Sequence, residues 1–591
     1  MKIKPYVIII AGMLLIISSC SKVLDTIPED SITDLNYWKT PTDMQLFANG
    51  FYNTLDGPTY NSQVFYDAAT DNFLPSTPDP RFFNNLSVPA SGGGWAATDW
   101  ANIRNLNYVL THYQTVVGDA TDISQNLGEI KFFRANEYFN KVKSFGDVPW
   151  VSKNLNVTDV NILFAARTPM NVVMDSIIAD LQFAVANLKL PSQVPVGRLH
   201  KYAAEVMLAR VALFEGTYLK YRGQSGDAYL TMAVNACQDI MTNGGYQIVK
   251  ANTNYYFPEY PLYYKAQFIA EDLTSNAECI LPRIFITNVV TNRQSGSAFG
   301  TTAYSVPKDF IEDFLCIDGL PIALSPLYLG DDSASMEMTN RDPRLRNTID
   351  NKFLPMYMKG TELVTYPVTP VAANVCPTGY MPSKYRDPLP IQNDANMTSD
   401  DWNIFRYAEV LLTFAEAKAE LGTITQADIN NSINLLRARL DEPGKFTMGR
   451  LSINPPADPN ALINGQPRYG YVVSPLIYEI RRERRVELSF ENRRWEDILR
   501  WKAGKLLENP KTMVGIVVNN DVIARYKFYN NGLDQFAGRA LLNITDWDGK
   551  NKNLIQAYAI ASRTWVDKLY FLPLPSDQLT LNTKLVQNSG W

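Results

Sequence analysis

The sequence predicts a mainly α-helical protein in which pairs of helices alternate with long irregular loops. Apolar residues recur at helical spacing in four stretches, which predicts helices that each bury one face. Segments rich in proline, glycine and aromatic residues lie between them and predict loops. The chain has 591 residues, of which 46% are hydrophobic and 19% charged. A chain of this composition can bury a large core, and its low charge excludes an intrinsically disordered protein.

The first predicted helices lie between residues 170 and 245. One apolar face consists of Met174, Ile177, Ile178, Leu181, Val185 and Leu188. The next face consists of Ala203, Met207, Val211, Phe214 and Tyr218. We expect this second helix to pair with a third around residues 228–242, in which Cys237 is a small buried hydrophobic residue.

A further helix pair is predicted between residues 407 and 440. Its first apolar face consists of Tyr407, Leu411, Phe414 and Leu421, with Val410 beside them, and its second of Ile429, Ile433, Leu436 and Leu440. Gly422 ends the first helix, and Thr425 with Asp428 resembles a capping box at the start of the second. The pair has the length of a tetratricopeptide repeat. No strict period of about 34 residues runs along the chain, so such pairs are expected to be separated by insertions.

Three long insertions are predicted, at residues 56–99, 251–268 and 441–475. The last holds six prolines and four glycines, too many for regular structure. The first two are rich in tyrosine and phenylalanine, which argues against disorder. Long loops inside a compact protein are usually functional, so the insertions are where a ligand site is expected.

The N-terminus predicts export and lipid anchoring. Lys2 and Lys4 precede an apolar run, Val7–Ile17, that is shorter than the roughly 20 residues of a membrane span. Cys20 follows two serines, as in a bacterial lipobox, so residues 1–19 are predicted to be a signal peptide and Cys20 the lipidated residue. Several acyl chains on one terminus give stable anchoring. The alternative is an ordinary secretory peptide, with Cys20 an incidental residue.

Charge and motifs exclude several function classes. The net charge of −5 gives no basic excess for nucleic-acid binding. His112 and His200 are the two histidines, so a histidine-based zinc site is hard to assemble and both are predicted to be structural. Asp331, Asp332 and Asp342 fall outside any calcium-loop pattern. The sequence also lacks a nucleophile elbow, an HExxH motif and a phosphate loop, so no catalytic residue, cofactor or metal ligand is predicted.

A dense cluster of charges lies in residues 476–502. Arg481, Arg482, Arg484 and Arg485 alternate with Glu479, Glu483, Glu487 and Glu491. The acids recur every four residues, which indicates a helix face with i, i+4 ion pairs rather than a phosphate-binding patch.

Eight blocks of sequence, found in the same order, resemble the SusD/RagB family of outer-membrane nutrient-binding lipoproteins. They are VLDTIPEDSITDLNYWKTPTD (23–43), WANI leading to Asn107 (100–107), GEIKFFRANEYFNKVKSFGDVPW (128–150), RTP (167–169), DPRL (342–345), RYAEVLLTFAEAKAELG (406–422), IYEIRRERRVELSFENRRWEDILRWKAG (477–504) and LYFLPLPSDQLTLN with a terminal QNSGW (569–591). The resemblance implies four helix pairs of the tetratricopeptide type and an irregular half with small β elements. It divides one intertwined body into an N-terminal region, 20–230, and a C-terminal region, 231–591.

The resemblance also implies a function. It predicts a lipid-anchored receptor of the outer membrane that faces the cell exterior, captures an oligosaccharide and passes it to a SusC-like TonB-dependent transporter without catalysis. Peptide or protein capture by the same fold is one alternative. A glycosidase with two carboxylates and a scaffold that binds only proteins are the others.

Sugar recognition needs aromatic faces for the C–H side of the ring and polar groups for its hydroxyls. Trp95, which follows three glycines, is the predicted stacking platform. Its predicted polar partners are Asp71, Asn72 and Arg81, and Tyr66 is the predicted second platform. Phe299 and Tyr304, from a later insertion, are further candidates for the glycan site.

Overall fold

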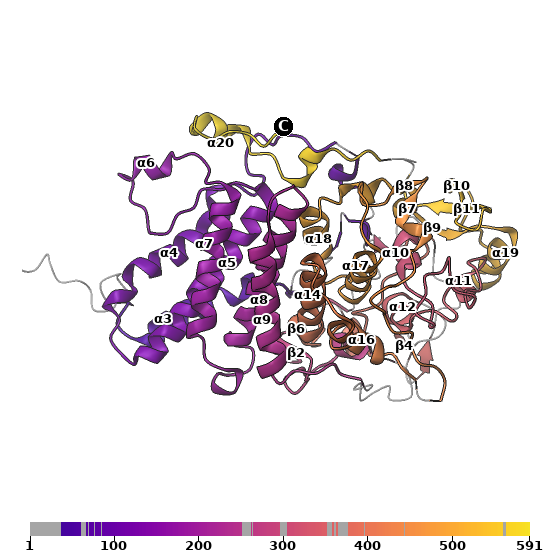
Figure 1. Ribbon diagram of the computed structural model, residues 1–591, viewed down its shortest axis with the longest axis horizontal. Coiled ribbons are helices and arrows are strands. Elements are labelled where there is room, and N and C mark those ends of the chain that lie inside the picture. Colours follow the sequence, from indigo (N-terminus) through magenta and orange to yellow (C-terminus); the bar gives the residue numbers. More distant parts are fainter. Residues whose placement is uncertain are drawn as a thin grey trace, which may run out of the picture.

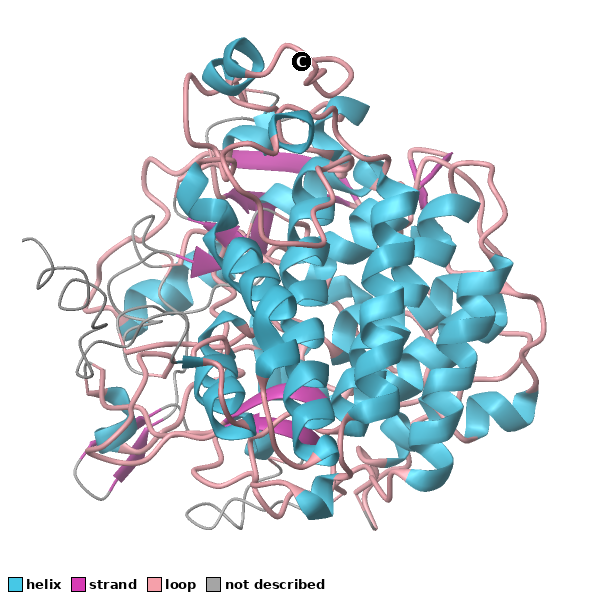
Figure 2. Ribbon diagram, turned by 90° about the vertical axis from the view of Figure 1, so that its left-hand side faces the viewer, coloured by secondary structure: helices cyan, strands magenta, loops and turns pink. Residues whose placement is uncertain are grey.

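The structure is a computed structural model that describes residues 37–591, except 61–66, 69, 76, 84, 251–261, 263, 296–303, 351–356, 360–361, 365–370, 372–375, 395, 443 and 559–562. Its long helices lie side by side in one half of the molecule, and short helices, strands and loops make up the other (Figure 1). Turned by 90°, these long helices run roughly parallel to one another (Figure 2). None of the described helices combines the length and apolar character needed to cross a membrane.

The helical half is built from α3 (Pro41–Asn49), α4 (Ala101–His112), α5 (Ala120–Phe145), α6 (Val160–Leu163), α7 (Met170–Asn187), α8 (Lys201–Lys220), α9 (Asp227–Asn243) and α14 (Tyr407–Glu420). Successive helices pack in the order α5, α7, α8, α9 and α14. The faces predicted for α7 and α8 are buried, and α8 pairs with α9 as expected. His200 starts α8 by accepting a hydrogen bond from the backbone of Ala203, which confirms its structural role.

The other half holds α10 (Lys308–Asp313), α11 (Ala334–Glu337), α12 (Pro343–Thr348), α13 (Pro390–Asn393), α15 (Gln426–Asn430), α16 (Ile433–Ala438), α17 (Pro475–Glu487), α18 (Arg494–Arg500), α19 (Asn520–Tyr529) and α20 (Ser576–Leu581). The capping box of Thr425 and Asp428 is confirmed, and Gly422 has the positive φ of a helix end. The single helix predicted over 429–440 is wrong, because the chain breaks at Asn431–Ser432 into α15 and α16.

The strands are short and antiparallel. They pair as β1 (Leu74–Pro75) with β3 (Tyr304–Ser305), β2 (Cys279–Arg283) with β6 (Trp402–Arg406), β4 (Tyr357–Lys359) with β5 (Glu362–Val364), β7 (Leu462–Ile463) with β8 (Gln466–Pro467), and β10 (Leu541–Thr545) with β11 (Asn551–Gln556), which also pairs with β9 (Val514–Val517). In the last sheet, Leu542 lies opposite Leu554, and Leu554 opposite Val517. These apolar side chains hold the β10–β11 hairpin against the body.

The arginines of α17 are buried, and their ion pairs reach outside the helix. Arg484 pairs with Asp497 of α18 at 2.9 Å, and Arg485 with Asp309 of α10 at 2.8 Å. The predicted i, i+4 pairing within the helix is therefore wrong, although Arg482 does pair with Glu479 three residues earlier. The helix also ends at Glu487, and Glu491 lies in the turn before α18. The spacing of the acids places them on one face, but that face is covered by the rest of the protein.

The cysteines that the structure describes are Cys237, Cys279, Cys316 and Cys376. All four are buried, free thiols. Cys237 lies in α9 within the apolar core, as predicted.

Candidate functional site

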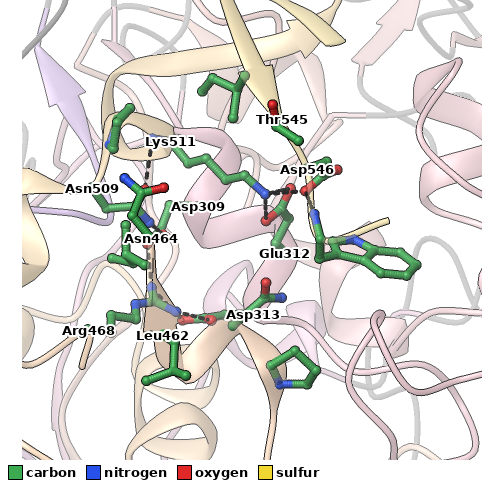
Figure 3. Close-up of a pocket in the computed structure, with 16 residues that line it drawn as sticks. Asp309, Glu312, Asp313, Leu462, Asn464, Arg468, Asn509, Lys511, Thr545 and Asp546 are labelled. Carbon is green, nitrogen blue, oxygen red and sulfur yellow. Dashed lines mark hydrogen bonds and ion pairs between the residues drawn. The ribbon is translucent and has the colours of Figure 1, made fainter. Parts of the chain in front are cut away.

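A cleft of about 260 Å³ lies between two hairpin turns in the loop-rich half. The β7–β8 turn brings Asn464 to one side, and the β10–β11 turn brings Thr545, Asp546 and Trp547 to the other (Figure 3). Asn464 is followed by Gly465, and both have positive φ, the conformation that an Asn-Gly hairpin turn requires. Trp547 is 39% exposed, the one tryptophan of the described chain whose side chain is well exposed.

The charged side chains that line the cleft already form ion pairs with residues of the protein. Lys511 Nζ donates to Glu312 at 2.7 Å and to Asp546 at 2.6 Å, and Asp546 also accepts from Lys552 at 2.8 Å. Arg468 donates to Asp313 at 2.9 Å (Figure 3). The backbone N–H of Trp547 donates to Asp546 at 2.9 Å, so the same carboxylate fixes the turn that presents the indole.

Burial and ion pairing act against each other on Glu312 and Asp546, and their pKa values shift in opposite directions. Burial, with the charge of Asp546 beside it, raises the pKa of Glu312 to about 7 although Lys511 opposes the shift. Burial also acts on Asp546, but Lys511 and Lys552 outweigh it and lower its pKa to about 2. Asp546 therefore stays an anion at neutral pH and keeps its hydrogen-bond acceptors.

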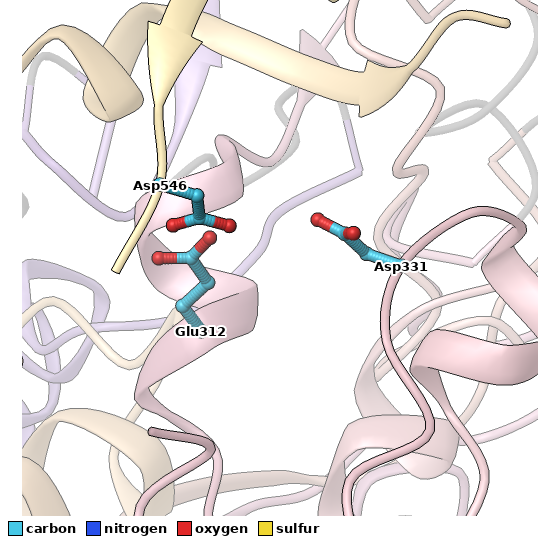
Figure 4. A group of neighbouring side chains, drawn as sticks. All are labelled: Glu312, Asp331 and Asp546. Carbon is cyan, nitrogen blue, oxygen red and sulfur yellow. The ribbon is translucent and has the colours of Figure 1, made fainter. Parts of the chain in front are cut away.

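Glu312, Asp331 and Asp546 come together beneath this cleft, with carboxylate oxygens within 4.8 Å of one another (Figure 4). Lys308 donates to Asp331 at 2.7 Å, and Lys552 donates to the same carboxylate at 2.7 Å. With Lys511, three ammonium groups meet the three carboxylates. Of the acids noted in the sequence, Asp331 belongs to this cluster, whereas Asp342 caps α12 and holds Arg344 at 2.6 Å.

The predicted stacking platform, Trp95, lies in the core with 5% of its surface exposed. Its ring packs edge-on against Trp100, with 5.1 Å between centroids, and against Phe145, at 4.8 Å. Stacking on a sugar needs an exposed ring face, and these contacts cover the indole. Its contact with a glycan stays a prediction, and the cleft above does not include it.

Asp71 and Asn72 are also buried, and both serve the arginines of α17 and α18. Arg494 forms a two-pronged pair with Asp71, at 2.7 and 2.6 Å, and Arg485 donates to Asn72 at 2.7 Å. Burial alone would raise the pKa of Asp71, but Arg485 and Arg494 hold it below its ordinary value. The structure therefore brings these two predicted residues together, at an internal network rather than at the cleft.

The other predicted residues are dispersed. Tyr304 is half-buried and stacks on Phe73, with 5.1 Å between ring centroids. Arg81 lines a second cleft, beside Trp495. Cys20, Tyr66 and Phe299, together with the predicted signal peptide 1–19, lie outside the described residues.

The sequence interpretation missed Trp547, Asn464 and Thr545. One local signal was present, because Asp546–Gly549 reads Asp-Trp-Asp-Gly between two stretches that alternate like strands. Such a turn places its tryptophan at a hairpin tip. Nothing in the sequence indicated that a second hairpin, about 80 residues earlier, lies opposite it.

Two family profiles match this chain. Residues 277–591, more than half of the chain, match the SusD family, and residues 47–213 match a family described as starch-binding and associating with the outer membrane. The SusD-like protein P2 of Formosa agariphila is 24% identical over 519 residues, which cover 86% of this chain and 92% of that protein.

Solved structures share the fold. A SusD-like protein from Bacteroides fragilis superposes with a TM-score of 0.67 at 21% identity, covering 96% of this chain and all of that one. A SusD-like carbohydrate-binding protein from the same species gives 0.66 at 22% identity, covering 93% of this chain and all of that one. The helix series, the small antiparallel strand pairs and the profile match agree, and the chain belongs to the SusD family of non-catalytic binding proteins.

Proposed function

We propose that this protein is a nutrient receptor that binds a glycan in the cleft beside Trp547 and delivers it to a partner TonB-dependent transporter. The observation that carries the proposal is the exposed indole of Trp547 at the edge of a cleft lined by polar side chains. A sugar ring presents C–H groups on its faces and hydroxyls around its rim. The indole offers an apolar face, and the amide of Asn464 and the hydroxyl of Thr545 offer donors and acceptors.

The paired charges support a neutral, hydroxyl-rich ligand at this cleft. Lys511 is shared by Glu312 and Asp546, and Arg468 by Asp309 and Asp313. A charged ligand would have to break such a pair before it gained a partner, whereas a hydroxyl can bond to a carboxylate that keeps its lysine. The carbohydrate-binding relative from Bacteroides fragilis supports the same ligand class.

Delivery to a transporter and anchoring through a lipid on Cys20 complete the proposal. The resemblance to the SusD family supports the first, and the lipobox-like sequence of the N-terminus supports the second. Mass spectrometry of the protein from its native membrane tests the lipid, and a Cys20→Ala variant is expected in the soluble fraction. Purification from the same membrane in mild detergent tests the transporter, which is expected to co-purify as a large β-barrel protein.

The binding test compares Trp547→Ala with Phe528→Ala. Phe528 is an exposed aromatic residue of α19 and lies outside the cleft lining, so it is the matched control. Loss of a large aromatic contact of about 1.5–3 kcal/mol predicts a 10- to 100-fold weaker affinity for Trp547→Ala and no change for Phe528→Ala. Calorimetry against starch and other soluble neutral polysaccharides measures both.

Equal affinities of the two variants would remove Trp547 from the site. Binding to peptides, with no polysaccharide bound, would replace the glycan receptor by a peptide receptor of the same fold. Neither variant should change the thermal unfolding midpoint by more than about 2 °C, because surface substitutions usually stay within about 0.5 kcal/mol.

A further inference from the structure

A second cleft, of about 240 Å³, lies where the end of α5 meets the turn between α17 and α18. Its lining includes Arg81, Asn140, Lys143, Asn492, Trp495 and Tyr570. Arg81 comes from the 3₁₀ helix Pro80–Phe83, so four segments distant in sequence meet here.

The charged residues that line this cleft are two cations, Arg81 and Lys143, and one carboxylate, Glu496, whereas carboxylates outnumber cations in the lining of the Trp547 cleft. Lys143 pairs with Glu496 at 2.7 Å, and Glu496 also accepts from Arg493 at 3.0 Å. Among the described residues, no carboxylate lies within ion-pair distance of Arg81, and its buried Nε has no hydrogen-bond acceptor. Within the part of the chain that the structure describes, Asp79 is the acid whose charge acts on Arg81, and it accepts the backbone N–H of Arg81 at 2.8 Å.

The position of Arg81 is nevertheless well defined. Its guanidinium lies over the ring of Trp495, 4.3 Å from the centroid, a cation–π contact. Burial lowers the pKa of Arg81, with Asp79 opposing the shift, but an arginine stays protonated in proteins. The Arg81 guanidinium is therefore partly desolvated, and its plane is set by the Trp495 ring. No neighbouring carboxylate of the described residues neutralises it, so an anion in the cleft would complete its hydrogen bonds.

We infer that this cleft binds the carboxylate of a uronic-acid unit, with Arg81 as the residue that selects the negative charge. A planar carboxylate matches the two parallel N–H groups of a guanidinium, and the amides of Asn140 and Asn492 suit the ring hydroxyls. The inference rests on the proposed glycan-binding function and adds a second site with a different ligand class. A glycan with both neutral and acidic units could use both clefts.

The test uses two matched pairs of probes, galacturonate with galactose and glucuronate with glucose, which differ in the carboxylate at C6. Binding to the full chain is measured by ligand-observed NMR for wild type, Arg81→Gln, Arg81→Lys and Phe528→Ala. We expect the wild type to prefer the uronates by about 10-fold. Arg81→Gln should abolish the preference, Arg81→Lys should keep part of it, and Phe528→Ala, which changes an exposed residue outside both clefts, should leave it unchanged.

A salt titration of the wild type gives a reading that does not depend on any variant folding. The preference should fall as the salt rises from about 0.05 to 0.5 M, because an accessible ion pair is screened. Equal binding of the acidic and neutral sugars, a preference that survives in Arg81→Gln, or tighter binding of a short peptide through its C-terminal carboxylate would each overturn the inference. Uronate selectivity without any neutral glycan bound would sustain it and overturn the site proposed at Trp547.

Discussion

Two helices of this protein, α7 and α17, are held in place by very different shares of apolar and ionic contacts. α7 buries mainly apolar side chains against its neighbours, among them Val173, Ile177 and Leu181, and has one buried acid, Asp180, which pairs with Arg134 of α5 at 2.7 Å. α17 buries four arginines, each paired with a carboxylate from another segment or from its own helix. Apolar packing fixes a helix through volume, and many arrangements of similar volume are tolerated. Buried ion pairs fix a helix because each cation must meet its own carboxylate. Such specific pairs can order the loop-rich half of the molecule, where the strands are short.

The largest loss of stability is expected at Glu487, which tests the ionic side of this comparison. Its carboxylate accepts from Arg344 at 2.8 Å and from Arg406 at 2.8 Å, and also from Arg439. Glu487→Gln leaves these buried guanidinium groups short of negative charge, and removing one partner of a buried pair costs about 3–5 kcal/mol. Denaturant unfolding is expected to show a loss of that size.

The matched control is Lys502→Met. Lys502 pairs with Asp567 at 3.5 Å, and both side chains are largely exposed. Exposed pairs contribute between 0 and about 1 kcal/mol, so this variant should unfold almost as the wild type does. A loss at Lys502 equal to that at Glu487 would show that burial does not set the strength of these pairs.

The apolar side of the comparison is tested by Ile177→Ala. Ile177 is fully buried in α7, and removing its side chain leaves a cavity, with an expected loss of about 2–5 kcal/mol. This loss should be the same at pH 5 and pH 8, because no titrating group is removed. A loss that changed with pH would mean that removing Ile177 also disturbs the ion pair between Asp180 of α7 and Arg134.

Glu215 extends the comparison, because it is a buried carboxyl group in the helical half. It lies in α8, and neither of its carboxylate oxygens has a hydrogen-bond partner in the described structure. Burial, reinforced by the charge of Asp175, raises its pKa to about 7, and Arg222 opposes the shift. The folded state therefore holds a proton that the unfolded state has released above a pH of about 4.5, so stability falls as the pH rises from about 4.5 to 7.

Glu215→Gln should remove this part of the pH dependence. Thermal unfolding at pH 5 and pH 8 is expected to show that the variant loses less stability than the wild type, by on the order of 2 kcal/mol. The pKa shift of Glu487 has the opposite sign. Burial acts to raise its pKa, but Arg439, Arg406 and Arg344 hold it below its ordinary value, so its stabilisation is lost only in acid. Identical pH profiles for wild type and Glu215→Gln would contradict the assignment.

The helices and the candidate site differed in how far the sequence could predict them. The periodicity of α7 and α8 is local, and the buried faces follow from it. For α17 the spacing of the charges predicted partners within the helix, whereas most partners lie in other segments. Spacing shows which residues share a face but not what that face contacts. Trp95 was expected to be exposed after three glycines, yet its partner Phe145 lies about fifty residues away. The Trp547 cleft depends on two hairpins meeting, which no local pattern contains.

The anchoring of Trp547 makes ligand preference a separable part of this protein. Asp546 is tied to Lys511 and Lys552 at the base of the turn, and the β10–β11 register is set by Leu542 opposite Leu554. Residues 547, 548 and 550 therefore project from a base that does not depend on their identity, while Gly549 supplies the positive φ of the turn. Substitution at those three positions could give a receptor for another sugar on the same scaffold.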